Sequence, residues 1–200
     1  MSKNIVFASH NKGKFLEIKD LFSEKGIELD FFGDYSNEEI EETGLSFHEN
    51  ALLKARFTAQ KTSKPALGDD SGLCIQALDQ KPGIHSARFA GEEKNFDANI
   101  QKVLSLMENK PNRSAYYVCV LAFVRHANDP LPQFFEGLWH GNIASHPEGT
   151  NGFGYDPIFI DQQTHQSIAK MPIADKIQKS HRTIALNHFF KSDLMRQENI

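Results

Sequence analysis

The sequence has few of the features that mark several common classes of protein. It contains only two cysteines, Cys74 and Cys119, both within apolar runs and without the C-x-x-C spacing of zinc and redox sites. Free thiols in such surroundings are typical of buried positions in a protein from a reducing compartment. The cysteines therefore predict buried free thiols rather than a zinc or redox site.

Long apolar runs and basic tracts are also missing. The apolar run near the start of the sequence is too short for a signal peptide, and no stretch approaches the roughly 20 apolar residues that cross a bilayer. The net charge is −4, and no basic tract dominates, which argues against general binding to a nucleic-acid backbone. These absences predict a cytoplasmic protein with neither a membrane nor a nucleic acid as its partner.

What the chain does contain is the composition of an ordinary globular protein. Its 200 residues are 40% hydrophobic and 24% charged, which suits one sizeable domain or two lobes that share a cleft. Strands are expected at 5–9, 27–32, 66–69, 73–78, 116–125, 134–145 and 157–160, and helices at 14–25, 46–63, 96–107 and 180–195. This mixture predicts an α/β fold, with an elongated mixed β-sheet and flanking helices in a single domain over residues 1–200.

Two local signals sharpen this assignment. Ser46 and Glu49 have the spacing of a capping box, which predicts the start of a helix. The strands expected at 116–125 and 134–145 are separated by a segment with Asn, Asp and two prolines, so they are predicted to pair as a long hairpin.

A polar turn lies between the first expected strand and the first expected helix. A helix N-terminus presents free amide groups and a partial positive charge, to which Lys12 and Lys14 add full charges. The turn therefore predicts a phosphate-binding site, although the Walker pattern is absent. Its candidate residues are Ser9, His10, Asn11, Lys12, Gly13 and Lys14.

Two adjacent acids, Asp69 and Asp70, interrupt an apolar stretch, and we interpret them as a turn between two strands. Adjacent carboxylates among apolar neighbours repel each other and resist desolvation, and a divalent cation would remove that cost. Magnesium prefers a small number of carboxylates together with waters and phosphate oxygens. One of these aspartates and a glutamate of the acidic segment 38–42 are therefore predicted to hold Mg2+.

A glycine-rich segment at 149–157 has the composition of a loop that binds a flat ring. Its glycines permit close backbone approach and positive φ angles. Phe153 and Tyr155 can stack on a base, and Asp156 can accept a hydrogen bond from a ring N–H. A phosphate site, an acidic metal site and a base pocket are together what a nucleoside triphosphate with magnesium requires.

These segments, in this order, resemble the inosine triphosphate pyrophosphatase family, also called the dITP/XTP pyrophosphatases. The matching segments span nearly the whole chain: 9–14, 41–55, 69–73, 82–91, 135–137, 151–159 and 180–182. The resemblance implies hydrolysis of the purine nucleoside triphosphates ITP, dITP and XTP to the monophosphate and pyrophosphate. It also implies a Mg2+ requirement, a homodimer, and a fold of two lobes with a central substrate cleft.

The resemblance also assigns roles by position. Asp70 matches the proton acceptor and a metal ligand, and Glu41 matches the other metal ligand, with Glu42 left as an alternative. The substrate contacts would be Ser9, His10, Asn11, Lys12, Gly13, Lys14, Ser71, Phe153, Gly154, Tyr155, Asp156, Lys176, His181 and Arg182. Lys179 remains an alternative to Lys176, because the segment before Ser180 departs from the family pattern.

Other functions remain open on the sequence alone. A related enzyme could prefer another base, such as a pyrimidine, or release free phosphate. A nucleotide-binding regulator without turnover would gain nothing from Asp69 and Asp70 unless a metal were present. A purely structural protein would not need four polar interruptions of its apolar pattern.

Overall fold

The computed structural model describes residues 3–91 and 95–196, which form two compact units. Unit 1 comprises Met1–Asp70, Cys119–Glu136 and Thr183–Ile200, and unit 2 comprises Ser71–Val118 and Gly137–Arg182. The strands form a six-stranded sheet in the order β2-β1-β3-β4-β5-β6. Three strands contribute residues to both units: β3 (Ala66–Ile75), β4 (Ser114–Val124) and β5 (Gln133–Ile143).

Unit 1 begins with a parallel β-α-β arrangement. β1 (Lys3–Ala8) leads into α1 (Lys12–Ser23) and returns as β2 (Ile27–Phe31), and β1 pairs in parallel with both β2 and β3. A short 3-10 helix, Phe32–Asp34, follows β2. Because the carboxyl end of β1 feeds directly into the N-terminus of α1, the predicted phosphate-binding turn lies at this junction.

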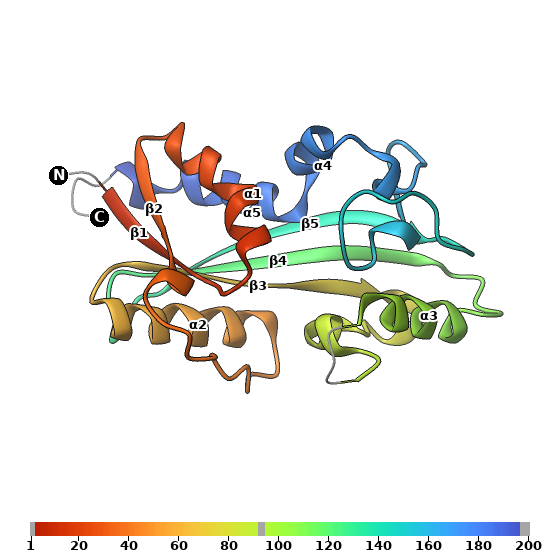
Figure 1. Cartoon of the computed structure of the whole chain (residues 1–200), viewed down its shortest axis with the longest axis horizontal. Coiled ribbons are helices and arrows are strands. Elements are labelled where there is room, and N and C mark those ends of the chain that lie inside the picture. Colours follow the sequence, from red (N-terminus) through yellow and green to blue (C-terminus); the bar gives the residue numbers. More distant parts are fainter. Residues whose placement is uncertain (1–2, 92–94, 197–200) are drawn as a thin grey trace. The chain divides into compact units, whose positions relative to one another are not determined.

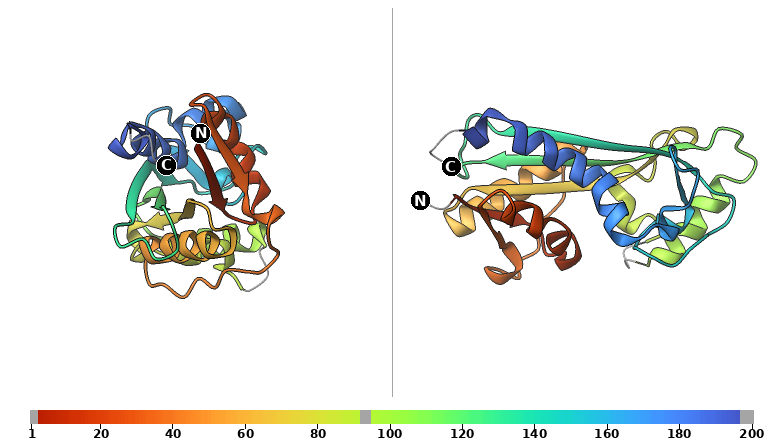
Figure 2. Two further views of the ribbon diagram at one scale, coloured as in Figure 1. Left: turned by 90° about the vertical axis from the view of Figure 1, so that its left-hand side faces the viewer. Right: turned by 90° about the horizontal axis from the view of Figure 1, so that it is seen from above.

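Helices cover both faces of the strands in unit 1. α1 and α5 (His181–Lys191) lie on one side, and α2 (Phe47–Thr62) lies on the other (Figures 1 and 2). The core on the α1 and α5 side is mainly aromatic and aliphatic and includes Phe7, Phe15, Ile18, Phe22, Leu121, Phe123, Leu186 and Phe189. A 3-10 turn, Asp193–Arg196, follows α5.

The helix α2 packs closely against the strands because alanines line part of its buried face. Ala51, Ala55 and Ala59 are buried along this face. The helix begins as predicted, since the Ser46 hydroxyl accepts a hydrogen bond from the Glu49 amide at 3.2 Å. A Cβ at Gly68 of β3 would lie 2.0 Å from the Ala51 carbonyl oxygen, so the strand can approach the helix only with glycine at this position.

Unit 2 has its own core. It contains α3 (Phe96–Leu106), α4 (Ile173–Lys179) and β6 (Phe159–Asp161), which pairs antiparallel with β5. Its short 3-10 helices are Gln76–Leu78, Gly83–Arg88, Asp156–Ile158 and Ile168–Lys170. The core side chains include Leu73, Ile75, Ile100, Val103, Met107, Tyr117, Trp139, Tyr155, Ile158 and Phe159.

Most of the predicted elements are confirmed within a few residues. The strands and helices of the β-α-β opening and α3 lie where the apolar pattern placed them, and α2 lies where the capping box placed it. β4 and β5 are neighbours in the sheet and are joined by residues 125–132, a connection short enough to require the predicted hairpin. The α/β class with a mixed sheet and flanking helices is therefore confirmed. The central substrate cleft stays a prediction.

One prediction about the acidic segment is wrong. Asp69 and Asp70 do not form a turn between two strands, because β3 runs without interruption from Ala66 to Ile75. The strand tolerates the acids because successive side chains point to opposite faces, where each carboxylate meets a lysine. Each aspartate therefore has its own lysine as a partner, rather than one cation shared by the pair.

The C-terminal third of the structure departs from the predicted elements in smaller ways. The strand expected at 157–160 is displaced to Phe159–Asp161 by a 3-10 turn, and the last helix begins at His181 and ends at Lys191. α4 was missed because none of its residues is buried, so it has no apolar stripe to reveal it. In the described part of the chain, no helix has the length and apolarity needed to cross a membrane.

Candidate functional site

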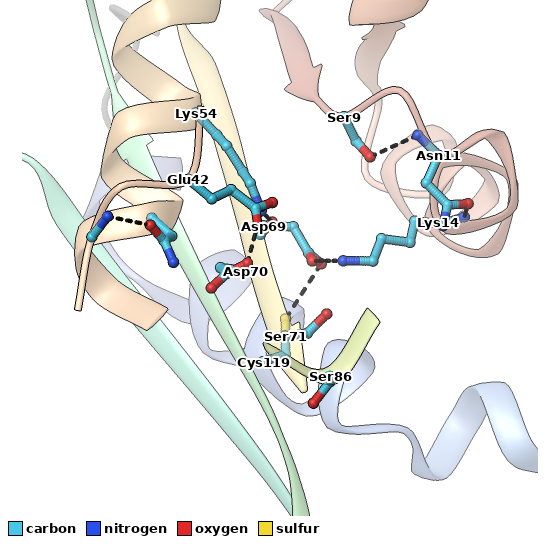
Figure 3. Close-up of polar contacts among 12 residues, drawn as sticks. Ser9, Asn11, Lys14, Glu42, Lys54, Asp69, Asp70, Ser71, Ser86 and Cys119 are labelled. Atoms are coloured by element: carbon cyan, nitrogen blue, oxygen red, sulfur yellow. Dashed lines mark hydrogen bonds and ion pairs between the residues drawn. The ribbon is translucent and has the colours of Figure 1, made fainter. Parts of the chain in front are cut away.

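Asp69 points from β3 toward Lys14 of α1 (Figure 3). The Lys14 ammonium lies 2.5 Å from Asp69 Oδ1, and the Cys119 thiol donates to Oδ2 at 3.4 Å. The Asp69 side chain is fully buried, whereas that of Lys14 is 18% exposed. Asp69 therefore anchors the ammonium group of a lysine that retains access to solvent.

Asp70 points the other way and belongs to an ion triad, in which Asp70 and Lys54 are buried and Glu42 is partly exposed (Figure 3). Lys54 Nζ lies 2.7 Å from Asp70 Oδ1 and 2.6 Å from Glu42 Oε1, and it also donates to the Asp69 carbonyl at 3.1 Å. Lys54 comes from the buried face of α2, between Ala51 and Ala55. The sequence analysis missed Lys54, although a lysine in the middle of an apolar helix face is a detectable signal.

Within the triad, the charged form of Lys54 is stabilised more fully than that of Asp70. Burial raises the pKa of the Asp70 carboxyl, and the attraction of Lys54 only partly offsets this effect. Burial also acts to lower the pKa of Lys54, but Asp70 and Glu42 together outweigh it and raise that pKa. The lysine is thus held charged, while Asp70 is a stronger proton acceptor than an exposed aspartate.

The second oxygen of Asp70 is the most informative atom of this cluster. Asp70 Oδ2 is buried and has no hydrogen-bond partner among the described residues. An unsatisfied buried carboxylate oxygen is costly, which suggests that a water, an ion or a substrate group completes it. Because Oδ1 is held by Lys54, Oδ2 is the atom available for chemistry.

These residues fit a magnesium ion. The donor set would be Asp70 and Glu42, which both contact Lys54, and magnesium commonly binds to one or two carboxylates while its other ligands are waters and phosphate oxygens. No group of three or more His, Cys, Asp or Glu side chains suited to a metal occurs in the parts of the chain that the structure describes. Both glutamate alternatives lie at exposed positions, and Glu42 reaches the Asp70 cluster through its ion pair with Lys54.

The turn before α1 has the structure of a helix N-terminus. The Asn11 side chain caps the helix by accepting from the Lys14 amide at 3.1 Å, and the Ser9 hydroxyl accepts from the Asn11 amide at 3.0 Å (Figure 3). Lys12 and Gly13 form the exposed first turn. The His10 ring is turned toward the Ser36 carbonyl at 2.8 Å. The turn therefore presents amides and lysines, as the sequence predicted.

In unit 2, Asp156 is the centre of a second cluster. Its Oδ2 atom accepts from the Phe153 amide at 2.9 Å and from the Lys176 ammonium, and its Oδ1 atom accepts from the Tyr117 hydroxyl at 3.3 Å. Asp156 is only 4% exposed. The Lys176 Nζ atom also lies 4.7 Å from the centre of the Phe153 ring, close enough for a cation–π contact.

The two aromatic candidates of the glycine-rich loop have different surroundings. Phe153 is 50% exposed, so its ring face can receive a flat ligand. Tyr155 is 3% exposed, packs in the unit 2 core and donates its hydroxyl to the Ser86 carbonyl at 2.8 Å. A ligand contact from Tyr155 would therefore come from its backbone. Gly154, with φ of +64°, allows the turn between them.

The start of α5 brings further predicted residues to unit 2. The His181 ring is stacked on Tyr117, with centroids 5.0 Å apart and planes 11° from parallel. Arg182 is 2% exposed and donates to the Ser71 hydroxyl at 3.2 Å. Of the two lysine alternatives, Lys176 joins the Asp156 cluster, whereas Lys179 exerts its charge on Asp161. The sequence analysis missed Tyr117, which contacts both Asp156 and His181.

In this second cluster, hydrogen-bond donors around Asp156 oppose the effect of burial on its carboxyl group. Burial raises the pKa of Asp156, and Lys176, the Phe153 amide and the Tyr117 hydroxyl act against this effect. Burial, together with the Asp156 charge, raises the pKa of Tyr117 well above its ordinary value. The Tyr117 hydroxyl therefore keeps its proton and remains a donor.

Comparison with known proteins places these clusters in context. A family model described as the Ham1 family matches residues 5–192. A protein named dITP/XTP pyrophosphatase from Acinetobacter baylyi is 44% identical, over 96% of this chain and 95% of its own. Another of that name from Vibrio parahaemolyticus is 45% identical, over 94% of this chain and 95% of its own.

Solved structures agree with this result. The structure of a HAM1 protein from Coxiella burnetii matches with a TM-score of 0.91 and 41% identity, covering 98% of this chain and all of that one. The Ham1 protein of Staphylococcus aureus matches with a TM-score of 0.85 and 39% identity, covering 94% of this chain and 96% of its own. The likeness therefore extends over nearly the whole chain.

Proposed function

The chain belongs to the Ham1 family, and from this membership we propose that it hydrolyses the non-standard purine nucleoside triphosphates ITP, dITP and XTP. The products are the nucleoside monophosphate and pyrophosphate. The observation that supports this most directly is the state of Asp70, with one oxygen held by Lys54 and the other buried without a partner. A binding protein has no evident use for such an atom, whereas a hydrolase needs one to accept a proton.

Asp70 is the proposed general base. Its Oδ2 atom accepts a hydrogen bond and then a proton from the water that attacks the α-phosphorus. Lys54 fixes the carboxylate through Oδ1, so the orientation of Oδ2 is set before substrate arrives. Because burial raises the Asp70 pKa, the carboxylate is a better proton acceptor than it would be in water.

Asp70 and Glu42 would hold Mg2+. When bound, the ion would supply positive charge to the triphosphate and lower the pKa of a coordinated water. We therefore propose Glu42, rather than Glu41, as the second carboxylate, because Glu42 contacts Lys54 beside Asp70.

The turn before α1 is the proposed triphosphate site. Lys12, Lys14 and the first amides of α1 would donate to phosphate oxygens and stabilise the negative charge that develops as pyrophosphate leaves. Asp69 holds the Lys14 ammonium in place. Phosphoryl transfer depends mainly on such positioning and charge stabilisation.

The Asp156 cluster is the proposed base site. The exposed face of Phe153 would stack on the purine, and Asp156 would accept from the ring N–H. Arg182 can only donate, so it suits the oxo group at position six of hypoxanthine and xanthine. Adenine has an amino donor there, and one unpaired donor would cost about 1–3 kcal/mol, which should make ATP a poor substrate. A homodimer and a cytoplasmic location stay predictions.

A panel of nucleoside triphosphates tests the proposal. The purified chain with Mg2+ should release pyrophosphate from ITP, dITP and XTP far faster than from ATP or pyrimidine nucleotides, and chelation of Mg2+ should stop the reaction. Free phosphate as the product would contradict the reaction type. Binding of ITP without any turnover would instead favour a regulator.

Adjacent aspartates provide a matched pair of variants. Asp70→Asn should fold normally and lower kcat by about 10²–10⁴-fold, the usual contribution of a general base. Asp69→Asn makes the same change one residue away on the opposite face of β3. It should act mainly on KM, through the position of Lys14. Near-normal turnover by Asp70→Asn would remove Asp70 from its role.

A further inference from the structure

Tyr117 of β4 contacts two residues of the proposed base site that come from different parts of unit 2. Its hydroxyl donates to Asp156, and its ring stacks on His181. The ring also packs on Phe159, with centroids 4.7 Å apart. The residue is 8% exposed, so this packing leaves it little freedom to move.

From these contacts we infer that Tyr117 is a positioning residue that determines base specificity, because its hydroxyl keeps Asp156 aimed and ionised as a hydrogen-bond acceptor. The inference rests on the proposed function, in that it takes Asp156 to be the group that meets the purine ring N–H. The assignment concerns Tyr117 itself, which would not touch the substrate.

The two oxygens of Asp156 are used differently. Oδ2 receives the Phe153 amide at 2.9 Å and the Lys176 ammonium, whereas Oδ1 receives only the Tyr117 hydroxyl among the described residues whose contacts are given. A carboxylate oxygen accepts about two hydrogen bonds. Oδ1 therefore keeps one acceptor position, and Tyr117 determines which way that position points.

Gly152 closes another side of the same carboxylate. A Cβ at Gly152 would lie 2.0 Å from Asp156 Oδ2 and 2.9 Å from Lys176 Nζ, and its φ of +84° also favours glycine. Bare backbone thus packs directly against the carboxylate. Together with Phe153 and Lys176, it anchors the carboxylate through Oδ2, and the Tyr117 hydroxyl holds it through Oδ1.

The protonation state of Asp156 would decide which purine it accepts. Ionised Asp156 accepts from the N1–H of hypoxanthine, whereas neutral Asp156 can donate to the N1 of adenine, which carries no proton. Burial favours the neutral form, and the Tyr117 hydroxyl is one of three donors that oppose it. The titratable groups that face this carboxylate are Lys176 from α4 and Tyr117 from β4, with Tyr155 close to Tyr117.

Tyr117→Phe separates the two contacts of this side chain. The phenyl ring keeps the stack on His181 and the packing on Phe159, so the fold and the His181 orientation should be retained. The hydroxyl is lost, and with it the donor to Asp156 and the hydrogen bond with the Tyr155 backbone. We expect kcat/KM for ITP to fall about 3- to 10-fold, which is the usual effect of losing one hydrogen bond. The loss should appear in KM, with kcat changed less than about twofold.

The decisive readout is the pH dependence of selectivity. Without the Tyr117 hydroxyl the neutral form of Asp156 is favoured, so the ratio of kcat/KM for ITP to that for ATP should fall below wild type. The deficit should grow as pH decreases from 8 to 5.5. Tyr116→Phe is the matched control, because Tyr116 precedes Tyr117 in β4 but has other contacts. It lies beside the His140 ring and interacts with Cys74. It should leave the ratio and its pH dependence unchanged.

Equilibrium binding of ITP and ATP in EDTA separates this inference from the proposed function, because no turnover is expected there. If wild type binds ITP but never hydrolyses it, the proposed function fails while the binding ratio still tests Tyr117. An unchanged ITP-to-ATP ratio in Tyr117→Phe, or an equal loss for both nucleotides at every pH, would overturn the inference. Failure of wild type to bind or hydrolyse either nucleotide when Mg2+ is present would overturn both.

Discussion

Replacement of Lys54 by methionine should show how much the ion triad contributes to stability. Methionine is about as long as lysine and suits a helix, so the change removes the charge with little change in volume. Lys54 Nζ contacts Asp70 Oδ1 at 2.7 Å, Glu42 Oε1 at 2.6 Å and the Asp69 carbonyl at 3.1 Å. The Asp70 side chain is only 7% exposed, so its charge would be left buried without a cation.

The expected magnitude follows from that burial. Removal of one partner of a buried ion pair typically costs about 3–5 kcal/mol, because the other charge remains desolvated. For a chain of this size, that loss corresponds to a decrease in Tm of about 6–20 °C. Glu42 is 29% exposed and can turn toward solvent, so most of the loss should come from Asp70.

Lys61→Met on the same helix is the matched control. Lys61 pairs with Glu38 at 2.5 Å, but both side chains are well exposed, at 41% and 54%. An exposed pair contributes about 0–1 kcal/mol, so this variant should remain near wild type. Both variants can be compared by urea unfolding, with Trp139 fluorescence and circular dichroism as two probes whose transitions should coincide.

Dependence on pH provides an internal check on the Lys54 prediction. Burial already raises the folded-state pKa of Asp70, and in Lys54→Met it should rise further above the unfolded value, because the lysine no longer offsets burial. A carboxyl group of this kind destabilises the fold when ionised, so the deficit should be full at neutral pH and shrink as pH falls toward about 4. A loss equal to that of Lys61→Met, or a deficit that grows with acid, would refute the reasoning.

Three further predictions follow from other parts of the molecule. Asp129→Asn should lower the free energy of unfolding at neutral pH and flatten its decline below about pH 4. The Arg125 guanidinium and two backbone amides hold the pKa of Asp129 well below its usual value, and this contribution to stability is present above the unfolded pKa and lost in acid. A decline in acid as steep as that of wild type would contradict this. Gly68→Ala should lower the free energy of unfolding in urea by about 1–3 kcal/mol or more, because its Cβ would lie 2.0 Å from the Ala51 carbonyl oxygen. Gly26→Ala, with φ of +68° and open space around it, should cost about 1 kcal/mol. Equal effects of the two changes would show that the contact with α2 relaxes freely. Phe153→Ala should leave stability within about 0.5 kcal/mol, since the ring is 50% exposed, yet raise KM for ITP at least about fivefold if the base stacks on it.

Much of the fold and the identity of most candidate residues could be predicted from local sequence. The capping pair Ser46 and Glu49, the apolar spacing of α1 and the two prolines between β4 and β5 each act over a few residues, so they could be read without tertiary information. The long matching segments likewise predicted the family that the comparisons confirm.

Tertiary structure decided how those residues are used, because contacts between distant positions leave no local pattern. Asp69 and Asp70 looked like a mutually repelling pair, but strand geometry sends one to Lys14, 55 residues away, and the other to Lys54. The choice of Lys176 over Lys179, the inward turn of Tyr155 and the link from Tyr117 to Asp156 have the same origin. Sequence determined which chemical groups are present, and folding determined which charges they meet, since burial and pairing arise only when distant segments pack together.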